Sequence, residues 1–78
     1  MIKLYGADSC HKTQHYKAFF LAHHLDFTFL DVKKNKENAK ELRNLYESGR
    51  LNFPTITIHQ KKLRNPSDKE LEKQCKGS

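Results

Sequence analysis

The N-terminal stretch limits the possible folds of this chain, because it leads a strand directly into a helix start with a cysteine at the junction. Residues 2–5 form a short apolar segment, residues 6–8 follow it, and a helical pattern begins at Cys10. Unpaired backbone N–H groups and the positive end of the helix dipole gather at a helix start, and both favour a thiolate over a thiol. This position predicts a nucleophilic Cys10. The alternative is a small packed residue, as many cysteines outside disulfides are.

The first half of the chain predicts a βαβ unit. Apolar positions recur at helical spacing behind Cys10 and predict a helix that runs to about His24, with Ser9 or Asp8 as its cap. The apolar face of this helix consists of Tyr16, Phe19, Phe20 and His23. Residues 27–32 are apolar and β-prone, which predicts a strand that is buried on both faces, as in a parallel sheet.

A second helix and a hairpin are predicted next. A helical pattern covers about residues 36–48, and Gly49 is well placed to end it. The buried stripe of this helix consists of Ala39, Leu42, Leu45 and Tyr46. Residues 55–58 alternate as a strand, residues 59–61 turn the chain, and residues 62–64 return as a short strand.

The chain is predicted to end in a short helix. Ser67 and Glu70 form a capping box at its start, and Leu71 and Cys75 form its inner face. The whole order is β-α-β-α-β-β-α, an α/β layout on a sheet of about four strands. At this length we expect residues 1–78 to be a single domain.

Charge and cysteine content narrow the classes of partner. The net charge is +6, but the basic residues are spread from Lys3 to Lys76, which is typical of a solvated surface and does not favour nucleic-acid binding. No apolar run approaches the length of a membrane span. Cys10 and Cys75 lie at opposite ends of the chain and do not make the dense framework of a small secreted domain. We therefore expect a cytoplasmic protein with reduced thiols, and we expect it to be a monomer.

Three motifs carry a resemblance to a known family. Residues 2–10, Ile-Lys-Leu-Tyr-Gly-Ala-Asp-Ser-Cys, are a strand that delivers a cysteine to a helix start. Residues 52–56, Asn-Phe-Pro-Thr-Ile, look like a loop with a cis-proline before the third strand. Residues 65–68, Asn-Pro-Ser-Asp, are a polar helix start after the hairpin. Together they resemble the glutaredoxin family over nearly the whole chain. The resemblance implies a thioredoxin-like fold, with a four-stranded mixed sheet flanked by three helices.

The cysteine motif departs from the common motifs of that family. Many members carry C-P-Y-C and one large branch carries C-G-F-S, whereas this chain has Cys10-His11-Lys12-Thr13. Because Thr13 replaces the second thiol, turnover would be of the monothiol type, with an external thiol completing the cycle. Thr13 lies one helical turn on and could donate a hydrogen bond to the Cys10 sulfur. His11 and Lys12, which are candidate substrate-binding residues, add positive charge near the sulfur, and protonated His15 would add more one turn later. Asp8 opposes them. The alternative for these residues is a solvated surface.

Two further segments are implied to bind the substrate. If the Phe53–Pro54 bond is cis, the backbone of Phe53 faces Cys10 and can pair with the cysteine of a bound thiol substrate. The alternative is a trans proline that merely opens an edge strand. By resemblance, Ser67 and Asp68 would hold the γ-glutamyl end of glutathione, and they also serve as a plain helix cap.

The implied reaction requires no cofactor, although glutathione is a possible co-substrate. Two family features that help to bind glutathione differ here, because Ala7 stands in place of a lysine and residues 65–66 replace a glycine pair. A metal site is not expected, because the spacing of the candidate ligands fits no standard zinc pattern. Those candidates are Cys10, His11, His15, His23 and His24.

The favoured function is a glutaredoxin-like thiol–disulfide oxidoreductase that uses the single nucleophile Cys10 through a mixed disulfide. Its partners would be glutathione, another low-molecular-weight thiol or a protein disulfide. The alternative is a non-catalytic protein of the same fold that binds a protein partner or a glutathione-ligated iron–sulfur cluster. Cys75 is interpreted as a packing residue rather than as a resolving thiol.

Overall fold

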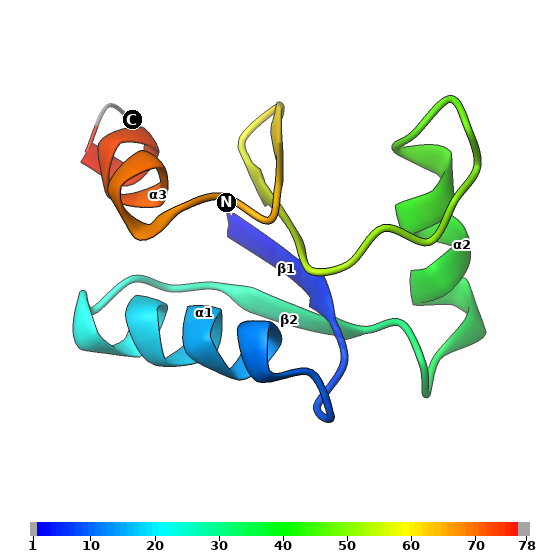
Figure 1. Ribbon diagram of the computed structural model, residues 1–78, viewed down its shortest axis with the longest axis horizontal. Helices are drawn as coiled ribbons and strands as arrows, with labels where there is room; N and C mark the ends of the chain where they lie inside the picture. The colour runs from blue at the N-terminus through cyan, green and yellow to red at the C-terminus, as the bar shows by residue number, and fades with distance from the viewer. Residues whose placement is uncertain (1, 77–78) are drawn as a thin grey trace.

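The computed structural model describes residues 2–76, which form seven elements in the predicted order β-α-β-α-β-β-α (Figure 1). These are β1 (Ile2–Gly6), α1 (His11–Ala22), β2 (Thr28–Asp31), α2 (Lys36–Asn44), β3 (Thr55–Ile58), β4 (Lys61–Arg64) and α3 (Asp68–Lys76). Both strands of the predicted hairpin and all three predicted helices are present.

A four-stranded mixed sheet in the order β2-β1-β3-β4 forms the centre of the structure. β1 pairs with β2 in parallel and with β3 antiparallel, and β3 and β4 form an antiparallel hairpin. Near the end of β1, Tyr5 lies opposite Leu30 on one side and Thr55 on the other. Because β1 is paired on both sides, the point from which the chain runs on to Cys10 is held firmly.

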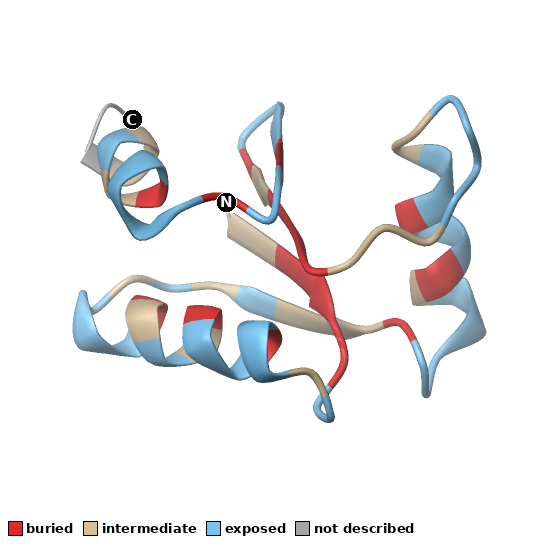
Figure 2. Cartoon of the chain, viewed as in Figure 1, coloured by how far each residue is buried: buried red, intermediate tan, exposed pale blue. Residues whose placement is uncertain are grey.

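β2 is parallel to β1 as predicted, but the expectation that it is buried on both faces is wrong. It lies at the edge of the sheet, where Thr28 is exposed and the three residues after it are only partly buried (Figure 2). An edge strand has one hydrogen-bonded neighbour, and an apolar run in the sequence does not distinguish this place from a central one.

The two faces of the sheet carry separate apolar clusters. α1 and α3 lie on one side of the sheet and α2 lies on the other (Figure 1). The buried residues of the first cluster are Leu4, Tyr16, Phe20, Ile56, Ile58, Leu63 and Leu71. Those of the second are Tyr5, Val32, Ala39 and Leu42. Alternate residues of β1 serve opposite clusters, because successive side chains of a strand point to opposite faces.

The buried face of α1 differs in part from the predicted one. Tyr16 and Phe20 are buried and Phe19 is partly buried, but His23 lies just beyond the helix and is exposed. Thr13 is fully buried instead. The face is therefore shifted toward the start of the helix, which brings a small polar side chain under Cys10.

α2 begins at Lys36 as predicted, but it ends at Asn44 and not near Ser48. Its N-cap is Asn35, whose side-chain oxygen accepts hydrogen bonds from two backbone N–H groups of the first turn, at 2.9 and 3.2 Å. At the other end, the Lys62 ammonium of β4 donates a 2.8 Å hydrogen bond to the carbonyl of Leu45. A side chain from the hairpin thus satisfies a carbonyl that a longer helix would have used.

The start and inner face of α3 agree with the prediction. The Ser67 hydroxyl accepts a 3.2 Å hydrogen bond from the backbone N–H of Glu70, which is half of the expected capping box. Leu71 is fully buried, and Cys75 packs partly buried against the same cluster.

Candidate functional site

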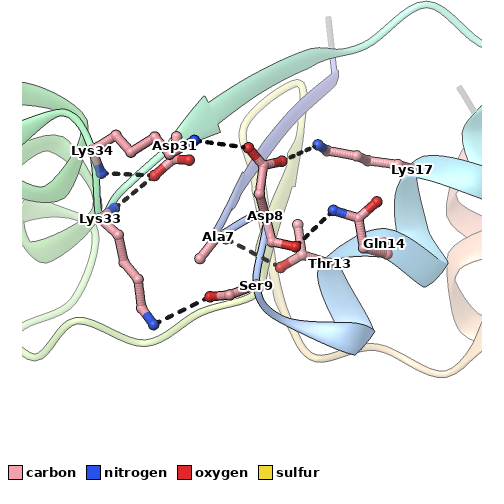
Figure 3. A network of polar contacts seen from close by, with 9 residues as sticks. All are labelled: Ala7, Asp8, Ser9, Thr13, Gln14, Lys17, Asp31, Lys33 and Lys34. Carbon is pink, nitrogen blue, oxygen red and sulfur yellow. Dashed lines mark hydrogen bonds and ion pairs between the residues drawn. The ribbon is translucent and has the colours of Figure 1, made fainter.

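Cys10 is itself the N-cap of α1, so the expectation that Ser9 or Asp8 caps this helix is wrong. The backbone of Cys10 is extended, with φ −91° and ψ 122°, and its carbonyl accepts the first helical hydrogen bond from Gln14 at 3.1 Å. Its own N–H donates to the carbonyl of Ala7 at 3.0 Å. The side chains of Ser9 and Asp8 are turned toward lysines instead (Figure 3). The thiol therefore occupies the place where a capping oxygen would accept from the free N–H groups of the helix.

Thr13 is the buried polar residue beneath this cap. Its side chain is fully buried, and its hydroxyl oxygen accepts a hydrogen bond from the N–H of Ala7 at 3.3 Å (Figure 3). A hydroxyl can accept and donate at the same time, so its hydrogen remains available for the Cys10 sulfur. Thr13 links the end of β1 to the thiol.

Gly6 is the residue that lets Thr13 approach the strand so closely. A Cβ atom at Gly6 would lie 2.8 Å from Cγ2 of Thr13 and closer still to its hydroxyl oxygen. The sequence carries no signal for this role of Gly6, because the need for a small residue arises only when the helix is packed on the strand.

Gly6→Ala is expected to push Thr13 away from the strand and to destabilise the protein by about 1–3 kcal/mol, the usual cost of overpacking. The displaced hydroxyl would no longer support the thiolate, so the pKa of Cys10 should rise. Urea unfolding and thiol alkylation at a series of pH values measure the two effects. Unchanged unfolding and alkylation profiles would contradict this account of Gly6.

The two cysteines have opposite electrostatic surroundings, and neither is in a disulfide. Partial burial raises the pKa of Cys10. Hydrogen bonding from the backbone and hydroxyl of Thr13, together with the backbone and charge of Lys12, lowers the pKa by more than burial raises it. The pKa of Cys10 therefore lies below the usual value for a thiol. The pKa of Cys75 is raised by burial. Cys10 is therefore the more readily ionised thiol.

Alkylation by iodoacetamide should separate the two thiols, because only the thiolate reacts. In Cys75→Ser, the rate should rise with pH through a midpoint below the ordinary thiol pKa of about 8.5. In Cys10→Ser, the midpoint should lie above that value and the rate at neutral pH should be much lower. Coinciding midpoints would contradict the hydrogen-bond arrangement described for Cys10.

The peptide bond between Phe53 and Pro54 is cis, not the trans alternative. Pro54 is buried, and its carbonyl accepts a 3.2 Å hydrogen bond from the N–H of Asn65, which ties it to the segment after β4. The Phe53 side chain packs on the α2-side cluster. Its ring lies 6.0 Å from the ammonium of Lys33, which also contacts Ser9 beside Cys10.

Asp68, at the start of α3, is joined to α1 by His15. The His15 Nε2 and Asp68 Oδ1 atoms are 2.7 Å apart, and both side chains are more than half exposed. Nearby, the Tyr16 hydroxyl donates to the backbone carbonyl of Pro66 at 2.5 Å. His15 therefore lies against Asp68, and this contact is not among the roles that the sequence suggests for it. A pairing across 53 positions has no signal in the sequence.

The negative charge of Asp8 is balanced by lysines from two elements. Its carboxylate accepts a 2.6 Å hydrogen bond from Lys17 of α1 and forms a 3.6 Å ion pair with Lys34 of the β2–α2 loop (Figure 3). The hydrogen bond from Lys17 is the main reason that the pKa of Asp8 is lowered. Asp8 thus opposes the positive charge of the site less than its position suggests. His11 and Lys12 are exposed in the first turn of α1.

Within residues 2–76, no group of three or more His, Cys, Asp or Glu side chains is arranged to hold a metal ion. None of the helices in that range has the length and apolar character that a membrane span needs.

Comparison with known proteins identifies the family. A family model described as glutaredoxin matches residues 2–63, which include Cys10, the cis-proline and all of the hairpin except its last residue. The chain belongs to the glutaredoxin family. This glutaredoxin-family chain has no match among curated proteins.

Solved structures show that this glutaredoxin-family chain has a thioredoxin-like fold. The thioredoxin-like protein BC3987 is 22% identical, with a TM-score of 0.81 over 95% of this chain and 99% of that one. A mutant of the same protein is 21% identical, with a TM-score of 0.82 over 96% and 99%. The glutaredoxin grx-1 from Archaeoglobus fulgidus is 19% identical, with a TM-score of 0.81 over 97% of this chain and 86% of that one. The predicted fold, an α/β layout with a four-stranded mixed sheet and three helices, is confirmed.

Proposed function

We propose that this protein is a monothiol glutaredoxin-type thiol–disulfide oxidoreductase that acts through Cys10. The observation that supports the proposal most strongly is the position of Cys10, which is the N-cap of α1 with the buried Thr13 one turn later. Membership of the glutaredoxin family implies a thiol–disulfide redox role in general terms. The pKa of Cys10 is lowered at this position and that of Cys75 is raised by burial, which supports Cys10 as the reacting thiol.

The reaction begins when the Cys10 thiolate attacks one sulfur of a disulfide. The bond between the two substrate sulfurs breaks, a mixed disulfide forms on Cys10, and the other sulfur leaves as a thiolate. The backbone of Phe53, beside the cis-proline, supplies hydrogen-bonding groups for the attached half of the substrate. Ser67 and Asp68, at the start of α3, provide polar groups for its far end.

Thr13 determines how the cycle is completed. A hydroxyl cannot attack a disulfide sulfur, so an external thiolate must displace Cys10 from the mixed disulfide. Glutathione or another low-molecular-weight thiol fills this role as co-substrate, and no bound cofactor takes part. The Thr13 hydroxyl stabilises the Cys10 thiolate both before attack and when it is released.

Incubation with oxidised glutathione tests the proposal, with intact mass as the readout. The Cys75→Ser protein should gain one glutathione, and added reduced thiol should remove it. The Cys10→Ser protein should gain none under the same conditions, which controls for adducts on Cys75. If Cys75→Ser forms no adduct with oxidised glutathione or with a small synthetic disulfide, the chain is not an oxidoreductase of this type.

A further inference from the structure

Lys33 stands between the two parts of the site, and it has no carboxylate partner among the residues that the structure describes. Its ammonium donates a 3.3 Å hydrogen bond to the hydroxyl of Ser9, the residue before Cys10, as Figure 3 shows. The same ammonium lies 6.0 Å from the centre of the Phe53 ring, next to the cis-proline. It therefore lies between the loop that carries the thiol and the loop that is proposed to dock the substrate.

The backbone of the β2–α2 loop holds Lys33 in this position. The Asp31 carboxylate, at the end of β2, accepts hydrogen bonds from the backbone N–H groups of Lys33 and Lys34, both at 2.8 Å. Side-chain capping of this kind fixes a tight turn at the end of a strand. The backbone from which the Lys33 side chain extends toward Ser9 is therefore constrained.

In the described part of the chain no carboxylate neutralises the charge of Lys33, in contrast to the charges of three other lysines. Lys17 and Lys34 both pair with Asp8, and Lys3 pairs with Glu41. Within residues 2–76, neither Lys33 nor Lys12 forms an ion pair with a carboxylate. Two cations without a carboxylate partner in this range therefore lie close to Cys10 in the chain or in space: Lys12 is on the first turn of α1, and Lys33 contacts Ser9, the residue before the cysteine.

We infer that Lys33 selects disulfides that carry a carboxylate close to the reacting sulfur. The inference rests on the proposed function and specifies the substrate class of the same site. The anionic half of the disulfide binds with its carboxylate at the Lys33 ammonium, in place of the neutral Ser9 hydroxyl, while its sulfur faces Cys10. The bonds made and broken are those of the exchange reaction already described. Charged groups at the rim of a site act mainly on encounter and selection of partners.

Rates with three small disulfides test this inference: one that carries carboxylates (5,5′-dithiobis(2-nitrobenzoate)), one neutral (bis(2-hydroxyethyl) disulfide) and one cationic (cystamine). Each is measured on Cys75→Ser and on the same protein with Lys33→Ala, Lys33→Glu or Lys36→Ala. Each rate is divided by the Cys75→Ser rate with the same disulfide, so that differences in leaving group cancel. Lys36→Ala is the matched control, because it removes an exposed charge at the start of α2.

Lys33→Ala should lower the relative rate with the anionic disulfide about fivefold, leave the neutral one unchanged and raise the cationic one. Lys33→Glu should enlarge both changes, and Lys36→Ala should cause neither. The effects should shrink at high salt, because exposed charges are screened. Equal changes with all three disulfides, or the same pattern in Lys36→Ala, would overturn the inference while leaving the proposed function intact. If no disulfide reacts with Cys10 at all, the proposed function fails and the inference with it.

Discussion

Thr13→Cys is expected to convert the proposed monothiol site into a dithiol one. Residues three apart lie on the same face of a helix, and Thr13 is buried directly beneath the Cys10 cap. One helical turn brings the two Cα atoms closer than about 7 Å, within the range of a disulfide. Mild oxidation should therefore close a bond between the two sulfurs, seen as the mass loss of two hydrogens. Reduction of insulin driven by a small dithiol should rise on the order of tenfold or more, because an internal thiol can now displace the substrate.

The experiment is best done in Cys75→Ser, so that the new thiol has only one partner. Thr13→Ser is the matched control: it keeps the hydroxyl that accepts from Ala7 and should show no gain in dithiol activity. The reduced Thr13→Cys protein should lose about 1 kcal/mol of stability, because sulfur accepts hydrogen bonds weakly. Adding Cys10→Ser should remove the new activity. Failure to form the internal disulfide would mean that Cys10 is not placed at the start of α1 as described.

Phe20→Ala is expected to cause the largest loss of stability among single changes in α1. Phe20 is fully buried in the cluster on the α1 side, where its ring centre lies 5.1 Å from that of Phe27 and 5.9 Å from that of Phe19. Removing a buried phenylalanine ring costs about 3–5 kcal/mol. A chain of this size has about 4–12 kcal/mol of unfolding free energy in total. A large part of that total would be lost.

The midpoint of urea unfolding, followed by circular dichroism, measures this loss. Leu21→Ala is the matched control, because Leu21 is the next residue of the same helix and is 67% exposed. That control should change the free energy of unfolding by no more than about 0.5 kcal/mol, as surface substitutions usually do. Equal midpoints for the two variants would show that α1 does not pack through Phe20.

The order of elements and much of the site could be read from the sequence because both depend on local signals. The alternation of residues 55–58 predicts β3 and the capping box at Ser67 predicts α3, and both elements form where they were expected. The position of Cys10 at a helix start follows from the change of hydrophobic period that comes after residue 5. A strand or a helix start is defined by residues that are neighbours in the chain, so its pattern is written there.

Features that depend on which element packs against which could be decided only by the tertiary structure. The same apolar run suits a central or an edge strand, so the edge position of β2 could not be predicted. The helix caps expected from the sequence also do not form. Ser9 and Asp8 precede the helix and could have capped it, but their side chains contact lysines from the β2–α2 loop and from α1 instead. Contacts of this kind join residues that folding alone brings together.

The sequence by itself determined that a cysteine stands at the end of a strand and the start of a helix, with a hydroxyl one turn later. Only the tertiary structure decided that Thr13 is buried against Gly6 and that Lys33 reaches Ser9. The physical reason is range, because caps and periodicity act over a few residues of chain. Burial and charge pairing act through space and depend on the packing of the whole sheet and its helices.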